Sequence, residues 1–399
     1  MSACNDHEKG ALPEPGRDAR VHSGQLADLI REDIAAAGGR IPFRRYMELA
    51  LYAPGLGYYA AAGGAGLGEQ ADFVTAPELS PLFARCLARQ CAETLDALGG
   101  GDVLEPGAGS GVLAAGLLAE LEHLGRLPRR YRILELSAEL AERQRATLAA
   151  RVPHLLDRCS WHPAWPAPFE GVVVANEVLD AIPIEGFRVG TGGVEQRCTV
   201  ADGPGFSDDW SPAPVDLARA VAHIEADLGR RLPAGYVSEF RPQLPGWFEG
   251  LAAALARGAV VLVDYGYVRR EYYLPERDAG TLVCTRAHRA HGDPYDWPGL
   301  TDLTAFVDFT AVTEAATAAG FELEGFTPQA HFLFSTGLEA VVAAALAADD
   351  ERERLLASQA VKKLTLPGEM GEKFNVIGFS KGLDAPMRGF AGNDLSRRL

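Results

Sequence analysis

The sequence predicts an α/β fold in which a parallel β-sheet is covered by helices on both faces. Between residues 102 and 176, short apolar segments alternate with longer segments of helical periodicity. The apolar segments are nearly continuous, which is typical of parallel strands buried on both sides. The first of them ends in a glycine-rich turn, LEPGAGSG at 104–111, and an Ala/Leu-rich helix follows. Such a strand–turn–helix unit is typical of sheets that bind nucleotides.

The predicted elements follow in order along the chain. Ser137 precedes a helical segment, and its hydroxyl is suited to cap the first turn. The alternation breaks at about 186–256, where short strands and a helix at 215–229 predict an α+β insertion. We expect strands at 102–106, 131–137, 171–176, 258–267 and 375–382, and helices at 111–124, 138–150, near 304–319 and near 338–360.

The segments outside this core have a different composition. Residues 1–20 are polar and mixed in charge, which predicts a disordered tail. Residues 21–99 combine helical periodicity with glycine-rich loops, and we expect an N-terminal helical and lid region there. The main domain is then expected to span 100–382, with a C-terminal tail at 383–399.

Composition and charge restrict the class of protein. The 399 residues are 47% hydrophobic and carry a net charge of −16, which repels phosphate backbones and disfavours nucleic acid as a partner. The six cysteines include no C-x-x-C pair, so a reducing cytoplasm is expected, and no metal site is expected. No apolar run reaches the 18 residues of a membrane span, and no signal peptide is evident. Oligomeric state is left open.

The glycine turn departs from the pattern of NAD-binding proteins. Gly107 and Gly109 fit the G-x-G-x-x-G pattern, but its third position is Val112, and Gly111 stands one residue early. Glu105 lies near the place of a pyrophosphate, and a carboxylate about 4 Å from a phosphate would cost roughly 4 kcal/mol. S-adenosylmethionine has no phosphate and carries a sulfonium. The sign of the charge therefore favours this cofactor over NAD.

A second carboxylate follows the second strand. Glu135 stands at the carboxyl end of the strand in ILELS, where ligands of open α/β sheets bind. It is suited to accept the hydroxyl groups of a ribose. This signal does not separate the two cofactors, since NAD proteins use the same device.

Three polar residues follow the strand at 171–176. Asn176, Glu177 and Asp180 lie where a substrate would meet the methyl group of the cofactor. If the acceptor is an arginine, two carboxylates are suited to hold its guanidinium, which is always charged. The alternative is equally open at this point: Asn176 caps a helix and the acids complement its dipole.

Other polar residues carry weaker signals. His288 and His291 have a helical i, i+3 spacing but lack a third metal ligand. Asp264 stands near the carboxyl end of the strand at 258–267 and is a candidate structural or orienting residue. The polar loop at 68–81 contains Asp72, Thr75, Glu78 and Ser80 and is a candidate lid over the site.

Taken together, the sequence resembles the MidA family of class I S-adenosylmethionine-dependent methyltransferases. Mitochondrial members of that family are complex I assembly factors that methylate an arginine of a complex I subunit. The resemblance covers about residues 21–382, and it implies a Rossmann-like class I methyltransferase sheet. It rests on the blocks IPFRRYMELALYAPGLGYY (41–59), DFVTAPELSPLF (72–83), LEPGAGSG (104–111), NEVLDAIPIEGF (176–187), VSEFRP (237–242), LVDYGY (262–267), GTLVCTRAH (280–288), TDLTAFVDFT (301–310) and KLTLPGEMGEKFNVIGFSKG (363–382).

The resemblance implies roles for individual residues. The N-terminal loop is expected to close over the cofactor, and Asn176 stands at the junction of cofactor and substrate. Two positions depart from the family: Phe306 stands where a histidine is frequent, and Ala108 replaces a larger basic residue. The cofactor-binding candidates are Glu105, Gly107, Gly109, Gly111, Glu135, Thr75, Pro77 and Asn176, and the catalytic candidates are Glu177, Asp180 and Asn176.

The leading hypothesis is an S-adenosylmethionine-dependent methyltransferase of the protein-arginine type. By resemblance, its candidate acceptor is a subunit of the respiratory NADH dehydrogenase. The alternative is an assembly chaperone that holds a partner with catalysis secondary or lost, in which the insertion at 186–256 is the partner surface. An NAD-dependent oxidoreductase is disfavoured by Val112 and Glu105.

Overall fold

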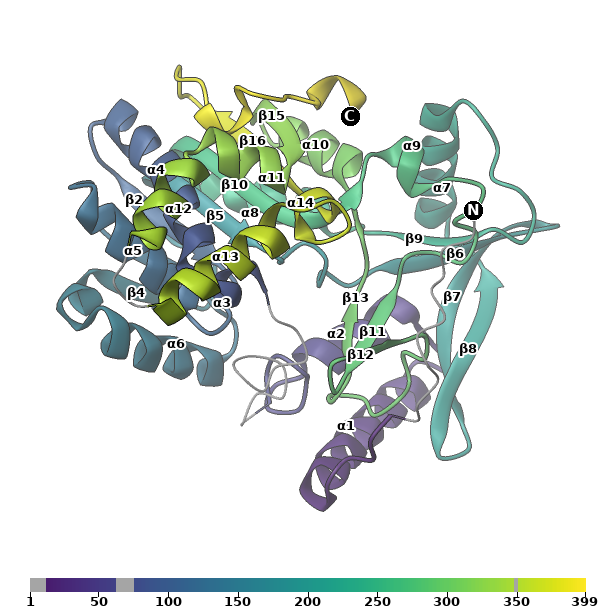
Figure 1. Cartoon of the computed structure of the whole chain (residues 1–399). Coiled ribbons are helices and arrows are strands. Elements are labelled where there is room, and N and C mark those ends of the chain that lie inside the picture. Colours follow the sequence, from purple (N-terminus) through teal and green to yellow (C-terminus); the bar gives the residue numbers. More distant parts are fainter. Residues whose placement is uncertain (1–11, 62–74, 348–350) are drawn as a thin grey trace.

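The computed structural model describes residues 12–61, 75–347 and 351–399 (Figure 1). Most of the segment expected as a disordered tail, and residues 68–74 of the candidate lid, lie outside this range. Helix α1 (Arg17–Ala36) begins inside that expected tail. Its buried face repeats every three or four residues through Leu26, Ile30 and Ile34, the spacing of one helix face.

The centre of the molecule is a mostly parallel sheet. Only β16 runs antiparallel to the strands around it, and the two-residue β14 (Val307–Asp308) pairs beside β10. Strand β2 matches its predicted bounds, β3, β5, β10 and β16 are confirmed with shifted ends, and β4 and β15 were not predicted. The spatial order is β15 (Glu322–Pro328), β16 (Phe374–Lys381), β10 (Leu255–Tyr267), β5 (Phe169–Asn176), β2 (Asp102–Pro106), β3 (Tyr131–Leu134) and β4 (Cys159–His162).

Helices cover both faces of this sheet, which confirms the predicted α/β class (Figure 1). Successive residues of β10 face opposite sides: Val261 packs into one core and Leu262 into the other. One face is covered by α4 (Pro81–Leu98), α5 (Val112–His123), α6 (Ala138–Arg151), α11 (Gln329–Ser335), α12 (Leu338–Leu346) and α13 (Glu351–Thr365), and the other by α8 (Leu244–Ala254) and α10 (Phe309–Ala318).

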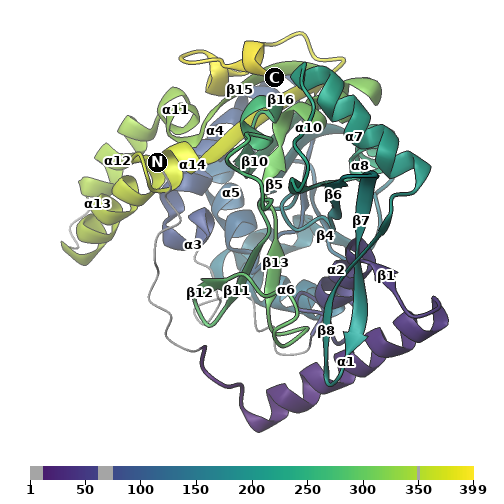
Figure 2. The same ribbon diagram turned by 90° about the vertical axis from the view of Figure 1, so that its right-hand side faces the viewer.

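The insertion forms a second sheet beside the first. All its strand pairs are antiparallel, and β1 (Ile41–Pro42) from the N-terminal region joins it by pairing with β7. Helices α1 and α2 (Phe43–Tyr52) share one apolar core with Ile184 and Phe206, so the beginning of the chain and the insertion form one body (Figure 2). The elements of the insertion are β6 (Glu185–Gly190), β7 (Gly193–Asp202), β8 (Gly205–Pro212), α7 (Val215–Leu228) and β9 (Val237–Phe240).

Two helix predictions near the C-terminal half need correction. The helix expected near 304–319 starts only at Phe309, because Asp308 caps it by accepting the backbone N–H groups of Thr310 and Ala311. The helix expected near 338–360 is two helices, α12 and α13, with residues 348–350 outside the described range. A small third sheet precedes α10 and consists of β11 (Val283–Arg286), β12 (Arg289–His291) and β13 (Asp302–Thr304), and the short helices are α9 (Arg269–Tyr272) and α14 (Met370–Lys373).

The segment after residue 382 packs onto the core. It contains two 3-10 turns, Arg388–Phe390 and Ser396–Arg398. A side chain at Gly325 or Gly378 would lie within 2.2–2.3 Å of the Phe390 ring, so these two strand glycines make room for it. No single helix in the described ranges is long and apolar enough to span a membrane; α11 and α12 pass that test only together, with a bend of 76° between them.

Candidate active site

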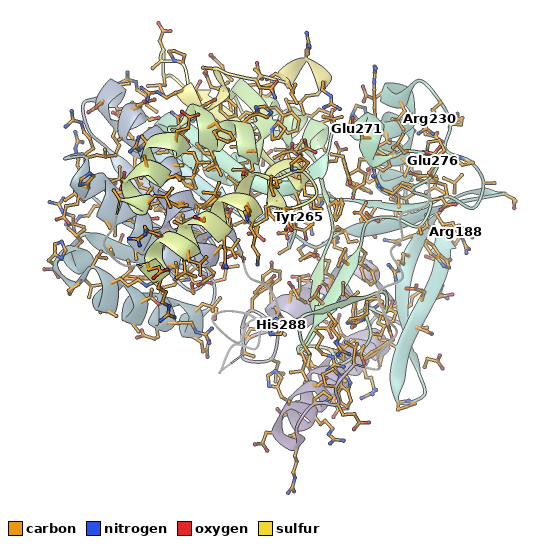
Figure 3. All side chains as sticks on the ribbon, in the orientation of Figure 1. Arg188, Arg230, Tyr265, Glu271, Glu276 and His288 are labelled. Atoms are coloured by element: carbon orange, nitrogen blue, oxygen red, sulfur yellow. The ribbon has the colours of Figure 1, made fainter. Side chains whose placement is uncertain are left out.

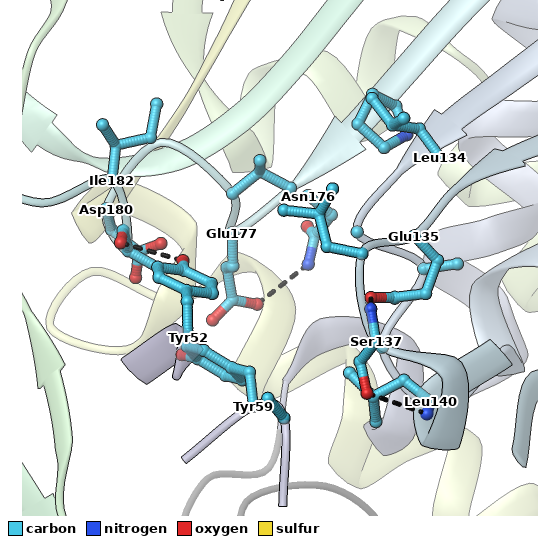
Figure 4. Close-up of a pocket in the computed structure, with 18 of the residues that line it drawn as sticks. Tyr52, Tyr59, Leu134, Glu135, Ser137, Leu140, Asn176, Glu177, Asp180 and Ile182 are labelled. Carbon is cyan, nitrogen blue, oxygen red and sulfur yellow. Dashed lines mark hydrogen bonds between the residues drawn. The ribbon is translucent and has the colours of Figure 1, made fainter. Parts of the chain in front are cut away.

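A cavity of about 1080 Å³ opens at the carboxyl ends of β2, β3 and β5 (Figure 4). The strand order reverses beside β2, with β3 and β4 on one side and β5 and β10 on the other. Ligands of open α/β sheets bind at such a switch point, because the loops on either side diverge there. Helix α2 of the second body supplies the opposite wall. This volume is at the upper end of the range of ligand-binding pockets, which is about 300–1,000 Å³.

The glycine turn lines this cavity in a conformation that requires glycine. Gly107, Gly109 and Gly111 have φ angles of 64°, 55° and 84°, all in the left-handed region. Gly107 and Gly109 line the cavity. Gly111 instead faces α6, where an added Cβ would lie 3.1 Å from Cα of Gln144. The structure thus separates the third glycine from the other two, with which the sequence had grouped it.

Glu105 lines the cavity but is almost completely buried. Its Oε2 accepts a hydrogen bond of 2.5 Å from the Tyr131 hydroxyl. Burial raises the pKa of this carboxyl to about 7. The charge argument drawn from the sequence is therefore weaker than it seemed, because at neutral pH this group is a full negative charge for only part of the time.

Glu135 is held by backbone and side-chain donors at the end of β3. Its Oε1 accepts the backbone N–H of Ser137 at 2.9 Å, and its Oε2 accepts from Gln144 Nε2 at 2.8 Å. Ser137 in turn caps α6 through the N–H of Leu140, as the sequence predicted. The carboxylate is therefore oriented before any ligand arrives (Figure 4).

Thr75 and Pro77 line the cavity beside the glycine turn. They belong to the short helix α3 (Ala76–Leu79) and to the residue before it. The hydroxyl of Ser110, in the turn, donates to the Glu78 carboxylate and fastens this segment to the cavity wall.

The end of β5 carries Asn176 and Glu177 into the cavity. Glu177 has φ 53°, a left-handed conformation that is uncommon for a non-glycine residue and often occurs at functional sites. Asn176 Nδ2 donates to Glu177 Oε1 at 2.9 Å, whereas the buried Oδ1 of Asn176 has no partner among the described residues. Withdrawal from bulk water raises the pKa of Glu177 to about 8, and the neighbouring Asp180 adds to the shift.

Asp180 and Asp264 complete a buried acidic cluster. Asp264 Oδ2 accepts the N–H groups of Leu179 and Asp180 at 2.9 and 3.2 Å and thereby holds the loop that follows β5. Asp180 is hydrogen-bonded to the hydroxyl of Tyr265. Burial raises the pKa of both carboxyls. The alternative in which Asn176 caps a helix does not hold, because residues 177–184 are not helical.

Several site residues were not found from the sequence. Tyr52 and Tyr59 stack with ring centroids 5.7 Å apart and line the part of the cavity near Glu177 and Asp180, which we call the acceptor side (Figure 4). The Tyr59 hydroxyl donates to Asp302 at 2.9 Å. Arg241 is buried and donates to the backbone oxygens of Asp180, Ala305 and Phe306. These side chains come from distant segments, and only their place in the blocks at 41–59, 237–242 and 301–310 could have drawn attention to them.

The wall of the cavity is strongly acidic. Among the described residues that line it, one side chain is basic, Arg44, and that group is paired with Glu185 at 3.1 Å. A positively charged ligand would be attracted into such a space, and an anionic ligand would be repelled. The eight acidic lining residues are Glu48, Glu78, Glu105, Glu135, Glu139, Glu177, Asp180 and Asp302.

The two departures from the family lie in different places. Ala108 lines the cavity within the glycine turn. Phe306 packs against Tyr265 and Tyr267 with centroids 5.1 and 5.5 Å apart, behind the acidic cluster. Tyr265 therefore links this aromatic group to Asp180.

The two histidines are not on a helix. Figure 3 labels His288 beside the β11–β12 hairpin, and its φ of 62° belongs to the turn that joins the two strands. The helical spacing of His288 and His291 was a wrong interpretation, since two left-handed residues in a row form a tight hairpin turn. No group of three potential ligands that could hold a metal ion occurs in the described ranges.

Known proteins are similar to this chain in sequence and in fold. Residues 86–327 match the family of S-adenosyl-L-methionine-dependent methyltransferases. Two solved structures of Burkholderia thailandensis proteins are 46% identical, cover 98% of this chain and 100% of theirs, and superpose with TM-scores of 0.90 and 0.92; the second carries bound S-adenosyl-homocysteine.

Curated relatives are more distant. The mitochondrial protein arginine methyltransferase NDUFAF7 of Danio rerio is 27% identical over 85% of this chain and 83% of its own length. The human protein of that name is 28% identical over 84% and 79%. The family match covers well over half of the chain and agrees with the cavity at the switch point. The chain belongs to this family of S-adenosyl-L-methionine-dependent methyltransferases.

Proposed function

We propose that this enzyme methylates an arginine side chain of a protein. The observation that carries the proposal is the acidic, aromatic acceptor half of the cavity, in which Glu177 and Asp180 lie beside the rings of Tyr52 and Tyr59. A guanidinium is planar, always charged and a donor only, so carboxylates and aromatic faces suit it. The names of the curated relatives support the same acceptor chemistry.

In this proposal, different residues of the chain contact different parts of the cofactor. Glu135 accepts the ribose hydroxyls, and the turn at Gly107 and Gly109 lets the backbone approach the ligand closely. Thr75 and Pro77 cover it, and Asn176 stands between cofactor and acceptor. S-adenosylmethionine, when bound, supplies a methyl group activated by a positively charged sulfur. The acidic residues here match that positive charge better than they would match a pyrophosphate.

Glu177 and Asp180 have two tasks toward the acceptor. They hold the guanidinium so that one of its nitrogens points at the methyl group. This orientation of the two reacting atoms lowers the barrier to methyl transfer. One of them then takes the proton that this nitrogen loses as the new N–CH₃ bond forms. A carboxylate whose pKa lies near 8 is a stronger base than an ordinary glutamate, so Glu177 is suited to accept this proton.

The identity of the acceptor rests on family resemblance. We propose a subunit of the respiratory NADH dehydrogenase as the acceptor protein. A location in the cytoplasm is also part of the proposal and rests on the sequence, in particular on cysteines without C-x-x-C spacing.

The decisive experiment uses an extract of cells that lack the gene, in which the acceptor is not yet methylated, and an extract of cells that carry the gene as the control. Purified enzyme and methyl-labelled S-adenosylmethionine are added to the deletion extract, and the labelled residue is mapped by mass spectrometry. We expect labelled arginine in an NADH dehydrogenase subunit. Label on another residue type would refute the arginine assignment. Failure to label any protein, with intact cofactor binding, would favour the assembly-chaperone alternative.

A further inference from the structure

Gln144 connects the two parts of the cofactor site from behind. This side chain of α6 is fully buried. Its Nε2 donates to Glu135 Oε2 at 2.8 Å and to the backbone oxygen of Gly109 at 3.1 Å. Both amide hydrogens are thus used, one on the carboxylate after β3 and one on the glycine turn after β2. A single side chain therefore sets the spacing between these two loops.

Trp161 determines which way the Gln144 amide points. The indole Nε1 of Trp161, on β4, donates to Gln144 Oε1 at 3.0 Å. An indole nitrogen is a donor only, so it selects the oxygen of the amide. The reversed amide would place its oxygen against the Glu135 carboxylate and the Gly109 carbonyl, and two repulsive contacts would replace two hydrogen bonds.

Gly111 makes this arrangement sterically possible. A Cβ at position 111 would lie 3.1 Å from Cα of Gln144 and 3.3 Å from its backbone oxygen, so a side chain there would push α6 away from the turn. The left-handed φ of 84° adds a second reason for glycine. The third glycine of LEPGAGSG thus serves the approach of α6, and Gln144 is the residue that this approach brings to the turn.

We propose that Gln144 is a positioning residue for the cofactor and that Trp161 sets its orientation. The inference rests on the proposed function in one respect, namely that Glu135 and the glycine turn contact the cofactor. Gln144 lies behind the cavity wall and acts through these two groups. Without it, Glu135 keeps only its backbone donors, and its carboxylate and the turn can move relative to each other.

The experiment measures the Kd of S-adenosylhomocysteine by calorimetry on the full chain. Gln144→Leu keeps the side-chain volume and removes both amide donors, and we expect Kd to rise about tenfold, as for loss of a hydrogen bond to a charged group. Trp161→Phe removes only the orienting donor, and we expect a rise of about threefold. At saturating ligand, both variants should still bind one S-adenosylhomocysteine per chain, as the wild type does.

Two matched controls separate positioning from loss of stability. Gln329→Leu removes another fully buried glutamine amide, whose Nε2 donates to the backbone oxygen of Leu364. Trp210→Phe repeats the indole change at a tryptophan that also carries an arginine over its ring, Arg188 there and Arg145 at Trp161. We expect both controls to lower Tm without changing Kd. Equal Kd increases in variants and controls at equal Tm loss would overturn the inference.

A double-mutant cycle tests whether Gln144 acts through Glu135. In a Glu135→Ala background, Gln144→Leu should weaken binding by no more than about threefold, because its charged partner is already gone. An undiminished tenfold effect would contradict the proposed route. If Gln144→Leu binds S-adenosylhomocysteine with wild-type affinity while Glu135→Ala binds it more weakly, this inference is refuted and the proposed function is not affected. Wild-type affinity in the Glu135→Ala variant would refute the assignment of Glu135 as a cofactor contact in the proposed function.

Discussion

The carboxylates on the two sides of the cavity differ in how well they are satisfied. On the cofactor side, Glu135 has a backbone donor and a side-chain donor before any ligand is bound. On the acceptor side, Glu177 has one amide donor, and an oxygen of Asp180 is buried without a partner among the described residues. Buried polar groups that lack partners cost free energy, so the acceptor side is built at the expense of stability.

This difference teaches what each side is prepared to do. A carboxylate with fixed donors keeps one orientation and is suited to recognise hydroxyl groups. Burial raises the pKa of carboxyls on both sides, but the acceptor side also has a buried carboxyl oxygen without a partner among the described residues and a left-handed backbone at Glu177. A positive ligand would stabilise the ionised form of these acceptor-side carboxyls. The following experiments are intended to break or sharpen this contrast.

The largest effect is expected from Glu177→Gln. The change keeps the shape and removes the charge and the proton acceptor, so we expect methyl transfer to fall about 100-fold. The Kd of S-adenosylhomocysteine should change less than twofold. Labelled methyl transfer into deletion extract measures the first quantity and calorimetry the second. Glu170→Gln, at an exposed position on the same strand, is the control; normal turnover in Glu177→Gln would remove this residue from the mechanism.

The converse is expected from Glu135→Ala. Loss of a charge-assisted contact to the ribose should raise the Kd of S-adenosylhomocysteine about 30-fold. Turnover at saturating cofactor should stay within a few-fold of the wild type. If turnover fell as in Glu177→Gln while affinity was retained, the division of labour between the two sides would be wrong.

The pH dependence should follow the acceptor side. With a pKa near 8, Glu177 is mostly protonated at pH 7 and mostly ionised at pH 9, so kcat/KM should rise about tenfold over that range. The guanidinium of the acceptor does not titrate there. Rates of labelled methyl transfer across this range measure the profile. The rise should vanish in Glu177→Gln, and its persistence would assign the titration to another group.

The ionisation of Glu177 should also affect the stability of the fold, which is expected to fall with rising pH whereas kcat/KM rises. The folded protein holds a proton on Glu177 up to about pH 8, whereas the unfolded chain loses it near the ordinary value of 4.5. Between these values the folded state binds more protons, so stability falls as pH rises, by up to about 1.4 kcal/mol per pH unit. Urea unfolding at pH 5.5 and 7.5 should give a smaller decrease for Glu177→Gln, and equal decreases would contradict the raised pKa.

The smallest effect is expected from Gly107→Ala. The left-handed φ of 64° and a 3.1 Å approach of the new Cβ to Val178 should destabilise the turn by about 1 kcal/mol. We expect a several-fold rise in the Kd of S-adenosylhomocysteine and a slightly lower Tm. Gly203→Ala, also left-handed but with open space around it, is the control for the backbone term alone.

The predictions from sequence succeeded where neighbouring residues carry the information. The strand at 102–106, the cap at Ser137 and the two-faced sheet follow from local patterns of apolar residues and capping side chains. The start of α10 was predicted wrongly, and the i, i+3 spacing of His288 and His291 does not correspond to a helix. In both, a helical spacing was overruled by a local detail, the Asp308 cap and two left-handed residues in a row.

The sequence by itself determined the α/β core, the place of the glycine turn and the presence of carboxylates at the strand ends. Each of these depends on residues within one short segment. Only the tertiary structure decided that Tyr52, Tyr59 and Arg241 join the acceptor side, that Gly111 faces Gln144, and that Glu105 and Glu177 are withdrawn from water. The physical reason is that burial, and with it the pKa of a carboxyl, is set by side chains that folding brings together from distant parts of the chain.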